Sequence, residues 1–157
     1  MRRLVVYMAG EAVGDLEQDD SGLLEFRYRQ EWLGRGGATA LSRSLPLQSA
    51  GFRGKHARAF FAGILPEEEP RRRIASILGV SERNDFALLE RIGGECAGAV
   101  SLLPEGIAPP AAGDVRVREL SDNELVKIVT ELPDRPLLAG EDGLRLSPGR
   151  SCPKRRP

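Results

Sequence analysis

The chain has 157 residues, 41% hydrophobic and 29% charged, which is the composition of one soluble domain that buries its own core. Lys plus Arg and Asp plus Glu both number 23, so no overall electrostatic field favours nucleic acid or an anionic membrane. The apolar run at residues 4–9 is too short for a signal peptide, and nothing approaches the roughly 20 apolar residues of a membrane span. We expect a cytoplasmic protein with no membrane contact and no direct nucleic-acid contact.

The two cysteines, Cys96 and Cys152, lie far apart and in unlike contexts. They do not form a disulfide framework of the kind found in small secreted domains, and two thiols cannot supply a four-cysteine zinc site. The sequence also lacks a convincing catalytic constellation. We therefore expect a chain that is not an enzyme by itself and that holds neither a metal nor a cofactor.

The first 28 residues predict a three-stranded antiparallel meander. Residues 4–8 and 12–17 are rich in apolar side chains and flank a turn that contains glycine. Residues 23–28 alternate between two faces with a period of two, which is typical of a half-buried strand. One helical turn at residues 30–33 follows, and it carries Trp32.

Residues 41–68 carry a heavy apolar load and organise the rest of the prediction. Residues 41–47 are expected to be extended. Pro46 indicates that this segment lies at a sheet edge or ends there, because proline cannot donate to a strand ladder. A short helix at 56–64 follows. Its adjacent Phe60 and Phe61, two of only five Phe in the chain, place the centre of the core in this region.

Two more helices are expected at residues 70–78 and 85–92, because apolar residues recur there at helical spacing. A short apolar strand at 99–103 follows them. Strands, then helices, then a strand predict an α+β fold. We expect an antiparallel sheet or partly closed barrel of about five strands, with the three helices on one side.

The chain is expected to fall into three segments. Residues 1–104 form the predicted domain. Residues 105–147 form a linker rich in Pro, Gly and Ala, a short strand, and a helix that a capping box at residues 121–124 opens. Residues 148–157 are rich in Pro and basic residues and predict a disordered tail.

Two features with a catalytic appearance have simpler interpretations. Residues 93–98, Gly-Gly-Glu-Cys-Ala-Gly, resemble a phosphate cradle, but they follow a helix and precede a strand, which is the reverse of a phosphate-binding loop. We favour a tight turn with close packing. Cys96 as a nucleophile would need His56, the only histidine, as its base, and no third orienting residue is evident.

Four residues are candidates for binding a partner. Trp32, the single tryptophan, is either a cap on the core or an exposed anchor for another protein. Arg71, Arg72 and Arg73 form either a solvated helix face or a docking site for an acidic partner. The residues alone leave both of these questions open.

Six sequence blocks are arranged in order along residues 4–100. They are residues 4–8 with Gly14, residues 26–28 with 31–33, residues 41–47 (Leu-Ser-Arg-Ser-Leu-Pro-Leu), residues 60–67 (Phe-Phe-Ala-Gly-Ile-Leu-Pro-Glu), residues 85–89 (Asp-Phe-Ala-Leu-Leu) and residues 92–100 (Ile-Gly-Gly-Glu-Cys-Ala-Gly-Ala-Val). In this order they resemble the N-terminal subdomain of HipA-family proteins, the serine/threonine kinase toxins of bacterial toxin–antitoxin modules. A weaker resemblance continues through residues 120–132 and 144–147.

The resemblance implies a non-catalytic regulatory subdomain that binds and modulates a HipA-type kinase core. In the family, the equivalent of residues 146–147 runs into a Gly-rich loop and then into the kinase core. The family's ATP-binding lysine and its catalytic and metal-binding aspartates lie there, so no residue of this sequence corresponds to them. The implied partners are a kinase core and a helix-turn-helix antitoxin, which makes the DNA contact in this family.

Residues 148–157 depart from the family pattern, since Pro148, Gly149 and Arg150 stand where the Gly-rich loop is expected. We hypothesise that this tail is a frameshifted remnant of the loop region. The chain would then be a non-functional truncated fragment of a HipA-like kinase toxin. Three further interpretations are a separately encoded partner of a kinase core, an enzyme only as part of a longer parent protein, and an unrelated binding module.

Overall fold

The computed structural model describes residues 1–95, 99–109 and 120–131. The chain divides into two units at the junction of Glu119 and Leu120, and each unit is described by itself. Outside the described residues lie the end of the predicted linker, nearly all of its short strand, residues 132–147 and the tail at 148–157. No helix of the described ranges is both long and apolar enough to cross a membrane.

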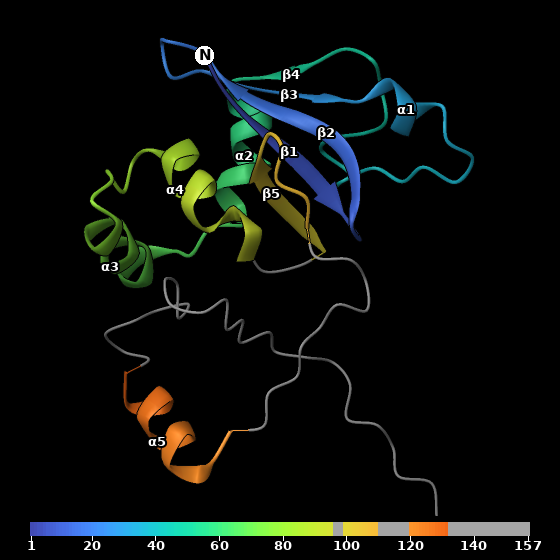
Figure 1. Ribbon diagram of the computed structural model, residues 1–157. Coiled ribbons are helices and arrows are strands. Elements are labelled where there is room, and N and C mark those ends of the chain that lie inside the picture. The colour runs from blue at the N-terminus through green and yellow to red at the C-terminus, as the bar shows by residue number, and fades with distance from the viewer. Residues whose placement is uncertain (96–98, 110–119, 132–157) are drawn as a thin grey trace, which may run out of the picture. The chain divides into compact units, whose positions relative to one another are not determined.

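The first unit is built on a five-stranded antiparallel sheet in the order β4-β3-β2-β1-β5 (Figure 1). Residues 2–28 form the predicted meander, and the last strand returns to pair with the first. The sheet stays open, and the α+β prediction is confirmed. The strands are β1 (Arg2–Met8), β2 (Glu11–Gln18), β3 (Leu24–Tyr28), β4 (Phe52–Arg53) and β5 (Val100–Pro104).

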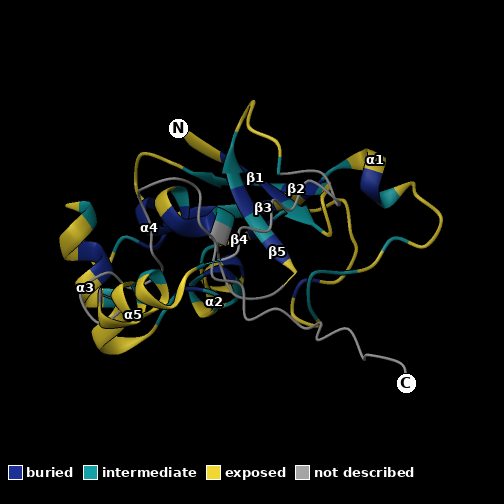
Figure 2. Cartoon of the chain, turned by 60° about the horizontal axis from the view of Figure 1, so that its bottom comes forward, coloured by how far each residue is buried: buried dark blue, intermediate teal, exposed yellow. Residues whose placement is uncertain are grey.

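The helices of the first unit lie close to their predicted positions. α2 contacts β3 and β4, while α4 contacts β5 and α2, so both cover the same face of the sheet. Figure 1 shows α3 on that side as well. Figure 2 shows that buried residues concentrate in the strands and in α4, whereas much of α3 is exposed. The helices are α1 (Gln30–Leu33), α2 (Lys55–Gly63), α3 (Glu68–Leu78) and α4 (Asp85–Ile92), the last ending in a 3-10 turn at Gly93–Glu95.

An aromatic cluster forms the centre of the core. The ring of Phe26 lies 4.8 Å from Tyr28, 6.3 Å from Phe52 and 5.3 Å from Phe61, measured between ring centroids. Such edge-to-face and offset arrangements add to the free energy gained by burying the rings. Phe61 is fully buried, as expected, whereas its neighbour Phe60 is only partly buried.

Gly14 is required where β2 passes over this cluster. A Cβ atom at this position would lie 2.5 Å from the Arg27 carbonyl oxygen and 2.5 Å from a ring carbon of Phe26. No side chain fits at those distances. The absence of one at Gly14 therefore leaves room for the Phe26 ring next to the backbone of β2.

The connection between α1 and β4 corrects the prediction of an extended segment at the sheet edge. Residues 42–45 form a tight turn, in which the Leu45 amide donates to the Ser42 carbonyl at 3.1 Å. The turn ends the extended run before Pro46. The edge strand is instead β4, whose Phe52 and Arg53 pair with β3.

Tyr28 fixes this connection from beneath. Its hydroxyl accepts a hydrogen bond from the Leu41 amide at 2.8 Å and donates one to the Leu45 carbonyl at 2.6 Å. Burial raises the pKa of Tyr28 and outweighs the lowering effect of the Leu41 amide, so the phenol stays neutral and able to donate. Leu45 itself is fully buried and closes the core under the turn.

In the second unit the described residues form α5 (Asp122–Glu131), the helix predicted from the capping box. The Ser121 hydroxyl donates to the Glu124 carboxylate at 2.8 Å, and the Glu124 amide points back to that hydroxyl at 3.4 Å. The Glu124 carboxylate also accepts from the Ser121 amide at 2.9 Å. These reciprocal bonds satisfy amide donors that a helix start leaves unpaired.

We expect Tyr28→Phe to lower the free energy of unfolding by about 1–3 kcal/mol, because it deprives the Leu41 amide and the Leu45 carbonyl of their partner. Urea unfolding followed by circular dichroism measures the change. Tyr7→Phe is the matched control, since the Tyr7 hydroxyl makes a surface hydrogen bond to the Ile107 carbonyl. Loss of this surface hydrogen bond should lower the free energy of unfolding by less than about 0.5 kcal/mol. Equal losses in the two variants would contradict the role of Tyr28.

Candidate partner interface

A buried carboxylate at the start of α4 holds three helices together. Asp85 is only 5% exposed. Asn84 precedes it as the helix cap, and its side-chain oxygen accepts from the Ala87 amide at 3.0 Å. A carboxylate in the first turn also interacts favourably with the helix dipole.

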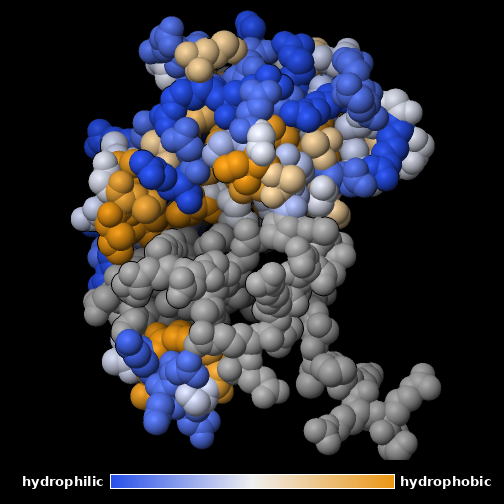
Figure 3. Space-filling model, viewed as in Figure 1, coloured by the Kyte–Doolittle hydropathy of each residue, from blue (hydrophilic) through white to orange (hydrophobic). Residues whose placement is uncertain are grey.

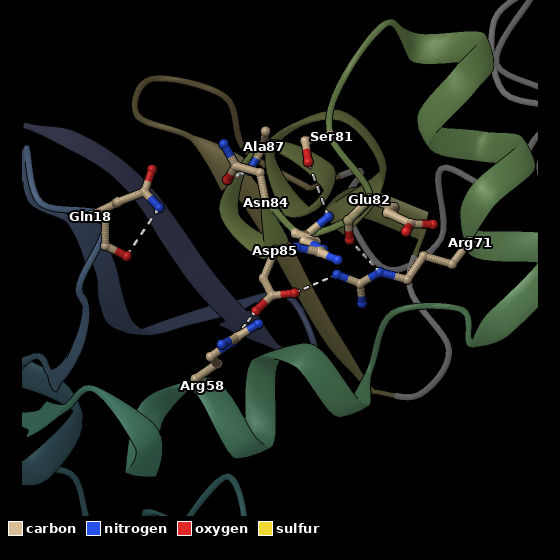
Figure 4. Close-up of polar contacts among 10 residues, drawn as sticks. Gln18, Arg58, Arg71, Ser81, Glu82, Asn84, Asp85 and Ala87 are labelled. Atoms are coloured by element: carbon tan, nitrogen blue, oxygen red, sulfur yellow. Dashed lines mark hydrogen bonds and ion pairs between the residues drawn. The ribbon is translucent and has the colours of Figure 1, made fainter.

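Two arginines from two other helices bind this carboxylate (Figure 4). From α2, the Arg58 Nε donates to one carboxylate oxygen at 2.5 Å, and from α3 Arg71 donates to the other. The Arg71 Nε also donates to the Glu82 carbonyl at 2.7 Å. Burying a charge is costly unless it is paired and hydrogen-bonded, and Asp85 meets both conditions.

The three consecutive arginines of α3 therefore have different roles. Arg71 is 18% exposed and engaged inside the domain, so it does not belong to an exposed basic patch. Arg72 and Arg73 point outward and pair with Glu69 of the same helix at 3.5 and 3.3 Å. The docking of an acidic partner on α3 remains a prediction, and it rests on Arg72 and Arg73 alone.

Trp32 occupies the position of a core cap. The residue is 9% exposed, and its indole Nε1 donates to the Thr39 carbonyl at 3.1 Å. The Arg35 guanidinium lies 5.6 Å from the ring centroid and covers part of the indole. Of the two alternatives for Trp32, this geometry fits a cap on the core better than an exposed anchor for another protein. Partner binding by the ring stays a prediction.

The structure does not bring the candidate residues into one site. Trp32 lies in α1, and the three arginines lie in α3. In both Figure 1 and Figure 2 these two helices are at opposite ends of the first unit. Any partner that touched all four residues would have to span the domain.

The two features with a catalytic appearance find no support among the described residues. His56 is exposed at the start of α2, while Cys96 lies outside the described residues, so their proximity is untested. A Cβ at Gly93 would lie 2.8 Å from the Leu102 Cβ, which confirms close packing between the end of α4 and β5. In residues 1–95, 99–109 and 120–131 no three His, Cys, Asp or Glu side chains are grouped to hold a metal ion.

The arrangement at Asp85, one carboxylate between two arginines, recurs at the surface. Asp15 pairs with Arg29 at 2.7 Å and with Arg3 at 3.1 Å, and the bond to Asp15 raises the pKa of Arg29. On the same face of the sheet Glu25 pairs with Arg27 and Arg53, both at 2.7 Å. The period-two alternation of β3 predicted which of its residues face solvent, but it did not predict which arginines pair with which carboxylates.

Exposed apolar side chains are prominent on α5. Leu125, Val126 and Val129 are 49%, 64% and 56% exposed. In Figure 3 apolar side chains gather on one part of α5, beside its hydrophilic ones. The capping box located this helix in the sequence, but the exposure of its apolar side became visible only in the structure.

The comparisons with known proteins identify the family. The sequence model of the family described as HipA N-terminal domain matches residues 4–103, well over half of the chain. The chain belongs to this family. The matched residues include the whole sheet except the ends of β1 and β5, together with α1 to α4.

Curated members of the family are much longer. The chain is 46% identical over 150 residues to Y4mE of Sinorhizobium fredii, named as a candidate kinase, and the match covers 94% of this chain and 36% of Y4mE. It is 26% identical over 152 residues to the serine/threonine-protein kinase toxin HipA of Shewanella oneidensis, covering 96% of this chain and 34% of that protein. The chain thus spans about a third of the length of these relatives.

A solved structure has the same fold. It is the Shewanella oneidensis MR-1 toxin–antitoxin complex of HipA, HipB and operator DNA, and one of its chains matches with a TM-score of 0.68 and 26% identity. The match covers 93% of this chain and 33% of that one. The resemblance predicted from the sequence blocks is therefore confirmed.

We expect Asp85→Asn to destabilise the first unit by about 3 kcal/mol, because it leaves Arg71 without its buried counter-charge. The value is at the lower end for a buried pair, since Arg58 is largely exposed and can rehydrate. Glu69→Gln is the control, because it breaks two ion pairs on an exposed helix face and should cost about 0.5 kcal/mol or less. A similar urea midpoint for both variants would show that Asp85 is not the junction of the three helices.

The single tryptophan gives a direct test of the position of Trp32. We expect the native fluorescence emission to be blue-shifted from that of the urea-unfolded chain, and acrylamide to quench it weakly, because the ring is buried and bonded to the loop that follows α1. Emission that does not change on unfolding would instead indicate an exposed ring.

Proposed function

We propose that this chain is a non-catalytic regulatory subdomain that binds a HipA-type kinase core in trans and modulates it. The observation that carries the proposal is the match of residues 4–103 to the HipA N-terminal domain. The structure supports it, because the first unit buries its own aromatic cluster and pairs its buried carboxylate, Asp85, with two of its own arginines. Such a unit has the contacts that it needs to fold apart from a kinase core.

The non-catalytic part of the proposal rests on the extent of the matches. The relatives are kinases by name, and the chain matches 36% of one and 34% of the other. We infer that the phosphoryl-transfer residues belong to the part of the relatives that this chain does not match. The chain would then contribute binding and regulation, and the core would contribute the chemistry.

A helix-turn-helix antitoxin is the second proposed partner. The solved relative is a complex that contains HipB and operator DNA together with HipA. That complex supports contact with an antitoxin as part of the proposal. Because DNA is also a component, the expectation of no direct nucleic-acid contact gains no support from the comparison.

Co-expression tests the proposed function. This chain, carrying an affinity tag, is expressed with the part of Y4mE outside the matched segment, and Y4mE is chosen because it is 46% identical to this chain. We expect the two to co-purify, and the autophosphorylation of the captured core to differ from that of the same truncated Y4mE expressed alone. The truncated Y4mE expressed alone shows whether its solubility depends on this chain.

Two results would contradict the proposal. Failure to co-purify, with both proteins soluble, would favour the interpretation of the chain as a non-functional fragment of a kinase toxin. Micromolar binding of ATP to this chain alone, measured by calorimetry, would contradict the non-catalytic assignment.

A further inference from the structure

α5 has an apolar stripe along one side. Its apolar residues are Leu125, Val126, Ile128 and Val129, which follow the i, i+1, i+3, i+4 spacing that places them on one face. Three of the four are exposed, and Ile128 is partly buried. Asn123, Glu124, Lys127 and Thr130 occupy the remaining arc, while Asp122 lies at the N-terminal end of the stripe.

This helix is too short to be stable by its own hydrogen bonds. It has ten residues, whereas isolated helices shorter than about 12–15 residues are marginal in water. Its start is already stabilised by the reciprocal bonds of Ser121 and Glu124. Three of its four apolar side chains are exposed, counted over the described residues, and burial of an amphipathic face is the main source of helix stability in proteins.

The extent of the matches indicates what covers the stripe. The family match ends at residue 103, before α5, but the matches to the longer relatives take in 94% and 96% of this chain. α5 therefore belongs to the sequence shared with full-length kinases, outside the N-terminal domain itself. The chain also divides between that domain and α5, at Glu119 and Leu120.

We propose that the apolar stripe of α5 is the surface that docks on the HipA-type kinase core, by insertion of an amphipathic helix into an apolar groove. This deepens the proposed function and rests on it. Leu125 and Val129, one helical turn apart, serve as the main contacts in the usual manner of helix-in-groove recognition. A second copy of this chain and the chain's own first unit are the competing occupants.

The test uses two matched double variants of the full chain. Leu125→Ala with Val129→Ala removes apolar bulk from the stripe but keeps the helix, because alanine has the highest helix propensity. The control, Asn123→Ala with Thr130→Ala, also introduces two alanines, but at exposed polar residues outside the stripe. Each variant is co-expressed with the truncated Y4mE used above, and the amount of core captured per chain is measured.

We expect the stripe variant to capture the core at least about tenfold less well, a loss of about 1.4 kcal/mol, because both truncated side chains give up apolar surface that docking would bury. The control variant should capture it as the natural chain does. If all three chains capture the core equally, the stripe is not the docking surface, although the proposed function stands. If the natural chain captures no core, both proposals fail.

Two measurements on the chains alone distinguish the competing occupants. Light scattering after gel filtration gives the mass of each chain, and a dimer that only the stripe variant loses would show that a second copy covers the stripe. Thermal unfolding followed by Trp32 fluorescence reports on the first unit. A lower midpoint in the stripe variant would show that the first unit covers it. Either result would overturn the docking proposal.

Discussion

The fold of the first unit depends on the charge of Asp85, which three helices share. α4 supplies the carboxylate, and α2 and α3 each supply one arginine to it. Much of α3 is exposed, and among its side chains only Ile74 and Ala75 are buried. Its apolar contact with the domain is therefore limited, and the bond from Arg71 supplements it. Because loss of either partner would leave a buried charge uncompensated, the bond from Arg71 holds α3 against the start of α4.

Side chains of neighbouring elements hold the loop between α1 and β4 in place by hydrogen bonds to its backbone. It has no strand or helix, and connections of this length are uncommon in compact domains unless they are held by their own contacts. Trp32 holds its beginning, Tyr28 holds its middle, and Arg27 donates to the Ser49 carbonyl at 3.2 Å near its end. All three holding residues come from β3 and α1, which places the loop on the same rigid part of the domain.

Sequence patterns predicted the elements of this fold but not their long-range contacts. Period-two alternation identified β3, and paired Phe residues located α2, since both signals are local in sequence. The tight turn at residues 42–45 was missed because the hydroxyl that holds it belongs to Tyr28, in a different element. For the same reason nothing in the sequence paired Asp85 with Arg58, 27 residues away. Among the candidate residues, burial assigned Arg71 to the interior and left Arg72 and Arg73 outside.

The pairing of charges favours an apolar mode of partner recognition. Four carboxylates, Asp15, Glu25, Glu69 and Asp85, each bind two arginines, so eight basic side chains are already engaged within the described residues. Each cluster keeps one net positive charge, which other carboxylates of the chain balance, and salt screens exposed charges beyond the Debye length of about 8–10 Å. With a formal net charge of zero, the chain then has little long-range field to attract a partner. For the proposed docking on a kinase core, apolar surface is then the main source of binding free energy, and α5 is where the described residues expose three large apolar side chains on one short helix.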